Sequence, residues 1–86
     1  MSKWEKLLMR IESLSNDLRF EELRRVMEFY GYTMKPPGSG SSHYTFRKSG
    51  HYPVTVPKHN PIKKVYVEMI RDIIEQEENE NENKNN

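Results

Sequence analysis

The sequence predicts one α+β domain: a three-stranded antiparallel sheet with two helices packed on one face, plus an extra N-terminal helix. The chain has 86 residues, the length of one small domain. Apolar residues recur at helical spacing near both ends of the chain, and strand-forming residues alternate between turn signals in the middle. The order of helix, helix, three strands and helix leaves the second face of the sheet uncovered.

Two amphipathic helices are predicted in the first third of the chain. In the first, apolar residues recur at helical spacing: Trp4, Leu7, Leu8, Ile11 and Leu14. In the second they do so again: Phe20, Leu23, Val26, Met27 and Tyr30. Gly31 follows in the position of a C-cap glycine. We interpret residues 1–17 as an accessory helix, whose apolar stripe either docks on the rest of the chain or binds a partner.

The sheet is predicted between residues 32 and 57. A short β-prone run at residues 32–34 ends before two prolines, and residues 38–42 are a flexible Gly/Ser turn. Residues 43–47 alternate as a strand, and residues 48–50 are a hairpin turn. Tyr52, Val54 and Val56 are expected to continue the sheet on one face, with the neighbouring prolines at an edge or a strand end.

The last helix is predicted to begin at Asn60-Pro61, because Asn caps free N–H groups and Pro suits the first helical position. Its apolar pattern is the strongest in the chain: Ile62, Tyr66, Met69, Ile70, Ile73 and Ile74. The main domain is therefore expected over residues 18–77. The Glu/Asn-rich residues 78–86 have too few apolar side chains to offset the entropy of ordering, so a disordered tail is expected.

The charge pattern indicates an anionic partner. The formal net charge is only +1, yet residues 29–67 contain no Asp or Glu. All three histidines lie there, together with these cations: Lys35, Arg47, Lys48, Lys58, Lys63 and Lys64. Such a run favours binding to a nucleic-acid backbone, because each Lys or Arg near a phosphate releases counterions. The alternative is a solvated basic sheet face. In either case these cations are expected on the uncovered face and its loops.

The residue inventory narrows the possible chemistry. The absence of Cys excludes disulfides and thiolate metal sites, and the motifs of serine hydrolases, zinc proteases, P-loop enzymes and EF-hands are missing. We therefore expect no metal site and no cofactor. Imidazole chemistry remains, and it suits RNA, whose 2′-hydroxyl is a built-in nucleophile. With neither a signal peptide nor a membrane span in the sequence, the expected location is the cytoplasm.

Each candidate side chain also has a structural explanation. His43 at a strand start either transfers a proton or bonds to a backbone carbonyl, and His51 after the turn glycine is expected at the surface. His59 either binds phosphate near a helix N-terminus or caps that helix. Aromatic residues in the strands either stack on bases or pack in the sheet: Tyr44, Phe46 and Tyr52.

Three segments carry a family resemblance: FEELRRVMEFYGY, GSGSSHYTFRKSG and YPVTVPKHNPIKKVYVEMIRDII. Residues 18–74 resemble the HicA family of small toxins from toxin–antitoxin pairs. The matching positions are Gly31-Tyr32, Ser42-His43, the run from Thr55 to His59, and the helix through Ile70, Ile73 and Ile74. The resemblance implies a double-stranded-RNA-binding-like fold and ribosome-independent mRNA cleavage catalysed by His43. It also implies inhibition by a HicB-type antitoxin.

These inferences define a site hypothesis. His43 acts as general acid or base at one phosphodiester, and His59 or water supplies the second proton-transfer group. The expected RNA-binding residues are Ser42, Arg47, Lys58, His59, Lys63 and Lys64. The partners are mRNA and the antitoxin, without a membrane. The rival hypotheses are a noncatalytic RNA-binding module with the same fold, an inactive family member, and a domain that binds only proteins.

Overall fold

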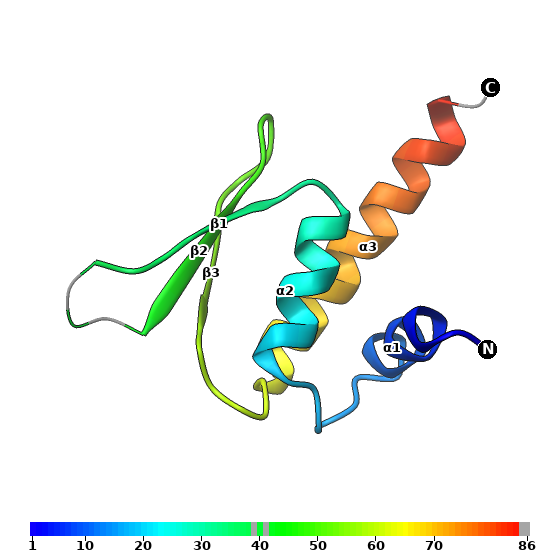
Figure 1. Cartoon of the computed structure of the whole chain (residues 1–86). Helices are drawn as coiled ribbons and strands as arrows, with labels where there is room; N and C mark the ends of the chain where they lie inside the picture. Colours follow the sequence, from blue (N-terminus) through cyan, green and yellow to red (C-terminus); the bar gives the residue numbers. More distant parts are fainter. Residues whose placement is uncertain (39, 41, 85–86) are drawn as a thin grey trace.

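The computed structural model describes residues 1–38, 40 and 42–84, and its architecture is α+β (Figure 1). The helices are α1 (Lys3–Glu12), α2 (Phe20–Phe29) and α3 (Lys64–Lys84). The strands β1 (Thr33–Lys35), β2 (His43–Arg47) and β3 (Val54–Pro57) form one antiparallel sheet in the order β1-β2-β3. The predicted fold class is therefore confirmed. None of the helices in the described residues has the length and apolar character needed to cross a membrane.

The register of the sheet separates a covered face from an open one. Tyr44 pairs with Val56 and Phe46 with Val54, and all four side chains are directed toward the helices. The Phe46 ring is fully buried, and its centroid lies 6.2 Å from that of Phe20 in α2. The alternate positions of the strands form the open face: Thr33, Lys35, His43, Thr45, Arg47 and Thr55. Period-two alternation thus places the apolar and polar side chains on opposite sides.

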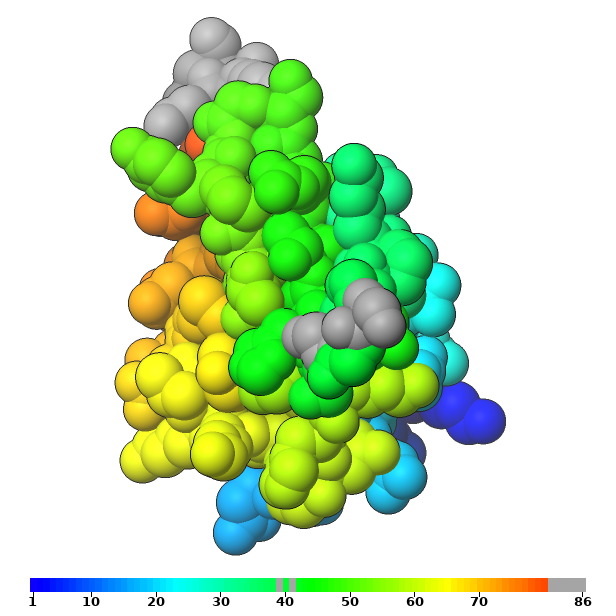
Figure 2. All heavy atoms as spheres, turned by 90° about the vertical axis from the view of Figure 1, so that its left-hand side faces the viewer, coloured from blue at the N-terminus to red at the C-terminus, as the bar shows by residue number. Residues whose placement is uncertain are grey.

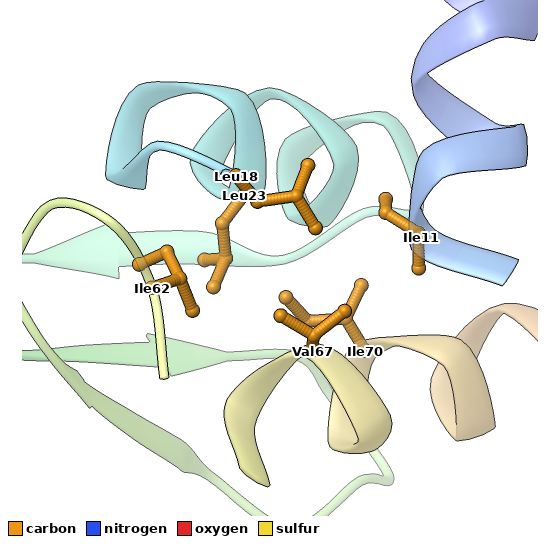
Figure 3. A pocket seen from close by; sticks show the side chains of 6 residues that line it. All are labelled: Ile11, Leu18, Leu23, Ile62, Val67 and Ile70. Carbon is orange, nitrogen blue, oxygen red and sulfur yellow. The ribbon is translucent and has the colours of Figure 1, made fainter. Parts of the chain in front are cut away.

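The N-terminal helix docks on its own domain. Ser2 and Glu5 form a capping box at its start, and the Ser2 Oγ accepts the Glu5 N–H at 3.1 Å. Leu7 and Ile11 are buried, and α1 packs against α3. Figure 3 shows Ile11 among apolar side chains of the central core, with no room for a water molecule between them: Leu18, Leu23, Ile62, Val67 and Ile70. The first apolar stripe is therefore a core contact.

The predicted glycine C-cap of α2 is confirmed. Gly31 has a φ of 93°, in the left-handed region that favours glycine. The Tyr32 N–H donates to the Met27 carbonyl at 3.0 Å, and the Gly31 N–H donates to the Glu28 carbonyl at 3.1 Å. This pair of bonds is a Schellman motif, and it turns the chain directly from α2 into β1.

The predicted start of the last helix is wrong, because α3 begins at Lys64 rather than at Asn60-Pro61. The Asn60 Oδ1 accepts the Phe20 N–H at 2.8 Å, so Asn60 caps α2 instead of its own helix. The Asn60-Pro61 peptide bond is cis. A cap supplied from 40 residues away has no signature in the local sequence, which explains the error.

The other end of α3 also differs from the expectation. The helix continues to Lys84, whereas the sequence predicts disorder from residue 78; residues 85 and 86 lie outside the described residues. Two contacts hold α3 at residues 77 and 78, where this segment begins. The Tyr30 hydroxyl donates to the Glu78 Oε1 at 3.0 Å, and Lys48 forms an ion pair with Glu77. These polar contacts replace the apolar burial that the segment lacks.

Candidate functional site

His43 is the first residue of β2, and its exposed side chain belongs to the open face of the sheet. Its Cα partner in the ladder is Pro57, the last residue of β3. One step further, the Lys58 N–H donates to the Ser42 carbonyl at 2.8 Å, which joins the start of β2 to the end of β3. Ser42, His43 and Lys58 therefore lie together at one end of the sheet. We call this region the sheet end.

The loop after β3 is fixed at both of its ends. Besides the Asn60 cap on α2, the Ile62 N–H donates to the Leu18 carbonyl at 2.7 Å, and the Ile62 side chain is buried. The Lys58 Nζ lies 5.8 Å from the centroid of the Tyr44 ring. This loop leads from the sheet end to the start of α3, and Figure 2 shows it beside the lower part of the strands. The position of Lys58 and His59 is thus determined by tertiary contacts.

The exposed His59 ring is oriented by its own loop. Its Nδ1 lies 3.0 Å from the Pro61 carbonyl oxygen, and a carbonyl only accepts, so Nδ1 is the donor. In the neutral ring, Nε2 is then the acceptor. The expectation that His59 caps a helix is wrong, because α3 begins five residues later. His59 follows Pro57, the partner of His43, by two residues, so both histidines belong to the sheet end.

The remaining predicted RNA-binding residues flank the sheet end. Arg47 lies on the same face as His43 but four residues further along β2, about 13 Å away at the normal rise of a strand. Lys64 is the first residue of α3, and Lys63 precedes it directly. All three side chains are exposed. They surround the sheet end without forming one compact cluster with His43.

The cations around this face have no carboxylate partners. Among the side chains that the structure describes, no ion pair involves the following residues: Lys35, Arg47, Lys58, Lys63 and Lys64. They all lie within residues 29–67, a segment that contains no Asp or Glu. The positive start of the α3 dipole adds to their charge. This face is therefore suited to an anionic ligand.

Two residues of the basic run, Lys48 and His51, lie in the β2–β3 hairpin loop, and their side chains contact α3. Lys48 pairs with Glu77 of α3, whose side chain is 11% exposed, and lies 5.7 Å from the Tyr32 ring centroid. The His51 Nε2 lies 3.5 Å from the same Glu77 carboxylate, and its Nδ1 donates to the Ser49 carbonyl at 3.1 Å. The β2–β3 hairpin reaches over α3, so the side chains of Lys48 and His51 contact another part of the same protein.

The same contact creates a residue cluster that the sequence did not reveal. In the described part of the chain, ligand atoms of His51, Glu77 and Glu80 lie within 4.8 Å of one another, an arrangement of metal-ligating types. The Lys48 ammonium already pairs with the Glu77 carboxylate at the centre of this group. Glu77 and Glu80 follow the hairpin by more than 25 residues, which is why local spacing gave no sign of them.

The strand aromatics are packing residues rather than an exposed stacking surface. Tyr44 is half-buried with its ring centroid 5.2 Å from that of Phe20, and Phe46 is in the core. The prediction that Tyr52 continues the sheet is wrong, since β3 begins at Val54. Tyr52 is 92% exposed in the hairpin. Pro53, directly before β3, and Pro57, at its end, limit this strand to four residues.

The sheet end can bind an anion and exchange a proton with it. It offers the exposed imidazoles of His43 and His59, beside cations that no described carboxylate neutralises. An imidazole transfers protons near neutral pH, and nearby cations stabilise developing negative charge on a phosphate. The described side chains at this end are thus of the types required for phosphodiester chemistry.

Comparison with known proteins identifies the family. The model of the family described as "HicA toxin of bacterial toxin-antitoxin" matches residues 20–77, which is more than half of the chain. No match was found among curated proteins or among solved structures. The matched segment begins with α2, includes the whole sheet and ends within α3, so it contains the sheet end but not α1. The chain therefore belongs to the HicA toxin family and is a toxin of the toxin–antitoxin type.

Proposed function

We propose that this toxin is a metal-independent endoribonuclease that cleaves mRNA in the cytoplasm and is held inactive by a HicB-type antitoxin. One observation carries the proposal: an exposed histidine stands at the start of β2, within the family-matched segment, beside cations that form no ion pair with any described carboxylate. RNA supplies its own nucleophile, so one well-placed imidazole together with positive charge is sufficient equipment for cleavage.

In the proposed reaction, the 2′-hydroxyl oxygen attacks the adjacent phosphorus while the bond from phosphorus to the 5′-oxygen breaks. The products are a 2′,3′-cyclic phosphate and a 5′-hydroxyl. His43 either accepts the proton of the 2′-hydroxyl or donates one to the leaving oxygen. One imidazole cannot do both in the same step, so His59, through Nε2, or a water molecule acts at the other oxygen.

The cations position the RNA and stabilise the transition state. The Lys58 backbone is bonded to Ser42, the residue that precedes His43. We propose that the Lys58 ammonium stabilises the negative charge that develops on the scissile phosphate. Lys63, Lys64 and Arg47 flank the sheet end and contact neighbouring phosphates, with Ser42 and His59 as polar contacts. This interaction is largely electrostatic, so affinity decreases as salt increases.

The decisive experiment is cleavage of a long mRNA by the purified protein and by its His43→Ala variant, both in excess chelator. We expect fragments with cyclic phosphate ends from the parent protein and intact RNA from the variant. His43 is exposed, so the replacement leaves the fold intact, which a thermal unfolding curve will show.

Two outcomes contradict the proposal. If the variant cleaves at the parental rate, His43 is not the catalytic residue. If neither protein cleaves but both retard the RNA on a native gel, the chain is a noncatalytic RNA-binding module. Cleavage that disappears with the chelator contradicts the metal-independent mechanism alone.

A further inference from the structure

A second basic surface lies between α1 and α2, away from the sheet. A groove there, which we call the α1–α2 groove, is lined by the following residues: Lys3, Lys6, Leu7, Arg10, Glu22 and Arg25. Leu7 is 4% exposed and forms the apolar floor. In Figure 1, α1 lies on the opposite side of α2 from the sheet. The groove is therefore separate from the proposed RNA site.

Two side-chain contacts between α1 and α2 define the geometry of the groove. Arg10 in α1 binds Glu22 in α2, with Nη1 2.6 Å from Oε2. The ring centroids of Trp4 and Phe29 lie 4.6 Å apart. One contact joins the last turn of α1 to the first turn of α2, and the other joins the start of α1 to the last residue of α2. Arg25 and the middle of α1 consequently lie between an ion pair and an aromatic pair.

The groove has an excess of positive charge. Arg10 pairs with both Glu22 and Asp17. Burial, which raises the pKa of Glu22, is outweighed by hydrogen bonds from Arg10 and the Arg19 N–H, so its pKa is lowered. Lys3, Lys6 and Arg25 are exposed, and no ion pair involves them among the described side chains. Three cations thus surround an apolar floor.

We propose that the α1–α2 groove binds an acidic amphipathic helix of a protein partner. Carboxylates of the partner pair with Lys3, Lys6 and Arg25, and its apolar stripe packs on the Trp4–Phe29 pair. Phe29 is 65% exposed, so part of this apolar surface is available. This arrangement corresponds to helix-in-groove recognition, with charge complementarity selecting the partner.

A protein helix fits these residues better than RNA does. A phosphate backbone brings no apolar surface to pack against Phe29, which is 65% exposed. RNA bound on the open face of the sheet is also separated from the groove by α2 itself (Figure 1). Four of the lining residues precede residue 20, outside the family-matched segment, so the groove depends on the α1 extension of this chain.

The test uses a fluorescein-labelled synthetic peptide of about 18 residues, roughly 27 Å long as a helix, with Leu on one face and Glu elsewhere. Binding is followed by fluorescence anisotropy. The test variant is Lys6→Glu/Arg25→Glu, and the control, Lys35→Glu/Lys64→Glu, makes the same change of net charge on the other side of the molecule. A labelled single-stranded RNA serves as the second probe, and RNA cleavage by each variant is measured in parallel.

We expect saturable peptide binding that weakens about tenfold in Lys6→Glu/Arg25→Glu and at most about twofold in the control variant. RNA cleavage should be unchanged in Lys6→Glu/Arg25→Glu, so the proposed nuclease function and the groove succeed or fail separately. Phe29→Ala should also weaken the peptide without changing its charge attraction.

Three results overturn the inference. The first is absence of saturable peptide binding, and the second is equal weakening in both double variants, which indicates nonspecific attraction. The third is a loss of RNA affinity in Lys6→Glu/Arg25→Glu as large as in the control variant, which identifies a nucleic-acid surface instead. Unfolding curves of each variant establish that the fold is retained.

Discussion

Two parts of one basic run have opposite electrostatic surroundings. At the sheet end, Lys58, Lys63 and Lys64 have no carboxylate partners among the described side chains, and His43 is exposed beside them. In the hairpin, Lys48 and His51 lie against Glu77. Both groups come from residues 29–67, where the sequence has no acid. Distance along the chain therefore does not determine which cations remain available to a ligand.

In this fold, a cation of the basic run is neutralised by an acid that lies far from it in the sequence. Glu77 is 29 residues beyond Lys48 and reaches it because α3 extends past the sheet under the hairpin. Near the sheet end, the loop from β3 leads into the basic start of α3, and no described carboxylate forms an ion pair with Lys58, Lys63 or Lys64. The run of basic residues thus indicates which cations could bind an anionic ligand. The path of α3 determines which of them are instead paired within the protein.

The largest difference in RNA cleavage rate is expected between the alanine variants of His43 and His51. His43→Ala should lower the rate of RNA cleavage by about 100-fold or more, because it removes a general acid or base. His51→Ala should keep the parental rate and lose about 1 kcal/mol or less of stability, because its half-exposed contact with Glu77 is weak. Equal loss of cleavage in both variants would contradict the assignment of the catalytic role to the sheet end rather than to the hairpin.

Lysine replacements separate binding from stability. Lys63→Ala/Lys64→Ala should reduce the slope of log affinity against log salt by about 2, since each phosphate contact contributes about 1. Lys48→Ala should leave that slope unchanged but cost about 1–3 kcal/mol of unfolding free energy, because the nearly buried Glu77 loses its partner. Filter binding and urea unfolding measure the two quantities. A changed salt slope in Lys48→Ala would place Lys48 on the RNA surface.

The Asn60 cap tests how firmly the sheet end is held. Asn60→Ala removes the acceptor of the Phe20 N–H and should cost about 1 kcal/mol of unfolding free energy. Because this bond also fixes the loop that carries Lys58 and His59, we expect a several-fold slower cleavage rate as well. Asn16→Ala, at an exposed position without such a bond, is the control. Unchanged cleavage would mean that the position of the loop does not matter.

The smallest effect concerns pH at the far end of α3. Burial, followed by the hydrogen bond to Glu78, raises the pKa of Tyr30 to about 12. A raised pKa means that the contribution of the neutral phenol is complete below pH 10 and disappears as pH rises through 12. Tyr30→Phe should therefore make the decline of unfolding free energy between these values shallower. Burial also raises the pKa of Tyr32, which accounts for a residual slope.

The strand predictions succeed where the sequence is locally decisive. Alternation over residues 43–47 defined β2 correctly, because one of its faces is buried. Gly31 marked the end of α2, because only glycine adopts its φ without strain. The start of α3 failed, because Asn60 satisfies an N–H group of a different helix. The turn at residues 38–42 includes residues 39 and 41, which lie outside the described residues.

For the site, the sequence determined the chemistry and the tertiary structure decided its geometry. Residue types alone indicated imidazole and cations without thiolates or clustered acids in the basic run, since local composition fixes the available functional groups. The pairing of β2 with β3 placed His43 opposite Pro57 and near the Lys58 backbone, and the length of α3 brought Glu77 into an ion pair with Lys48 and into contact with His51. Such contacts join residues far apart in the chain, and Coulomb attraction depends on distance in space rather than along the sequence.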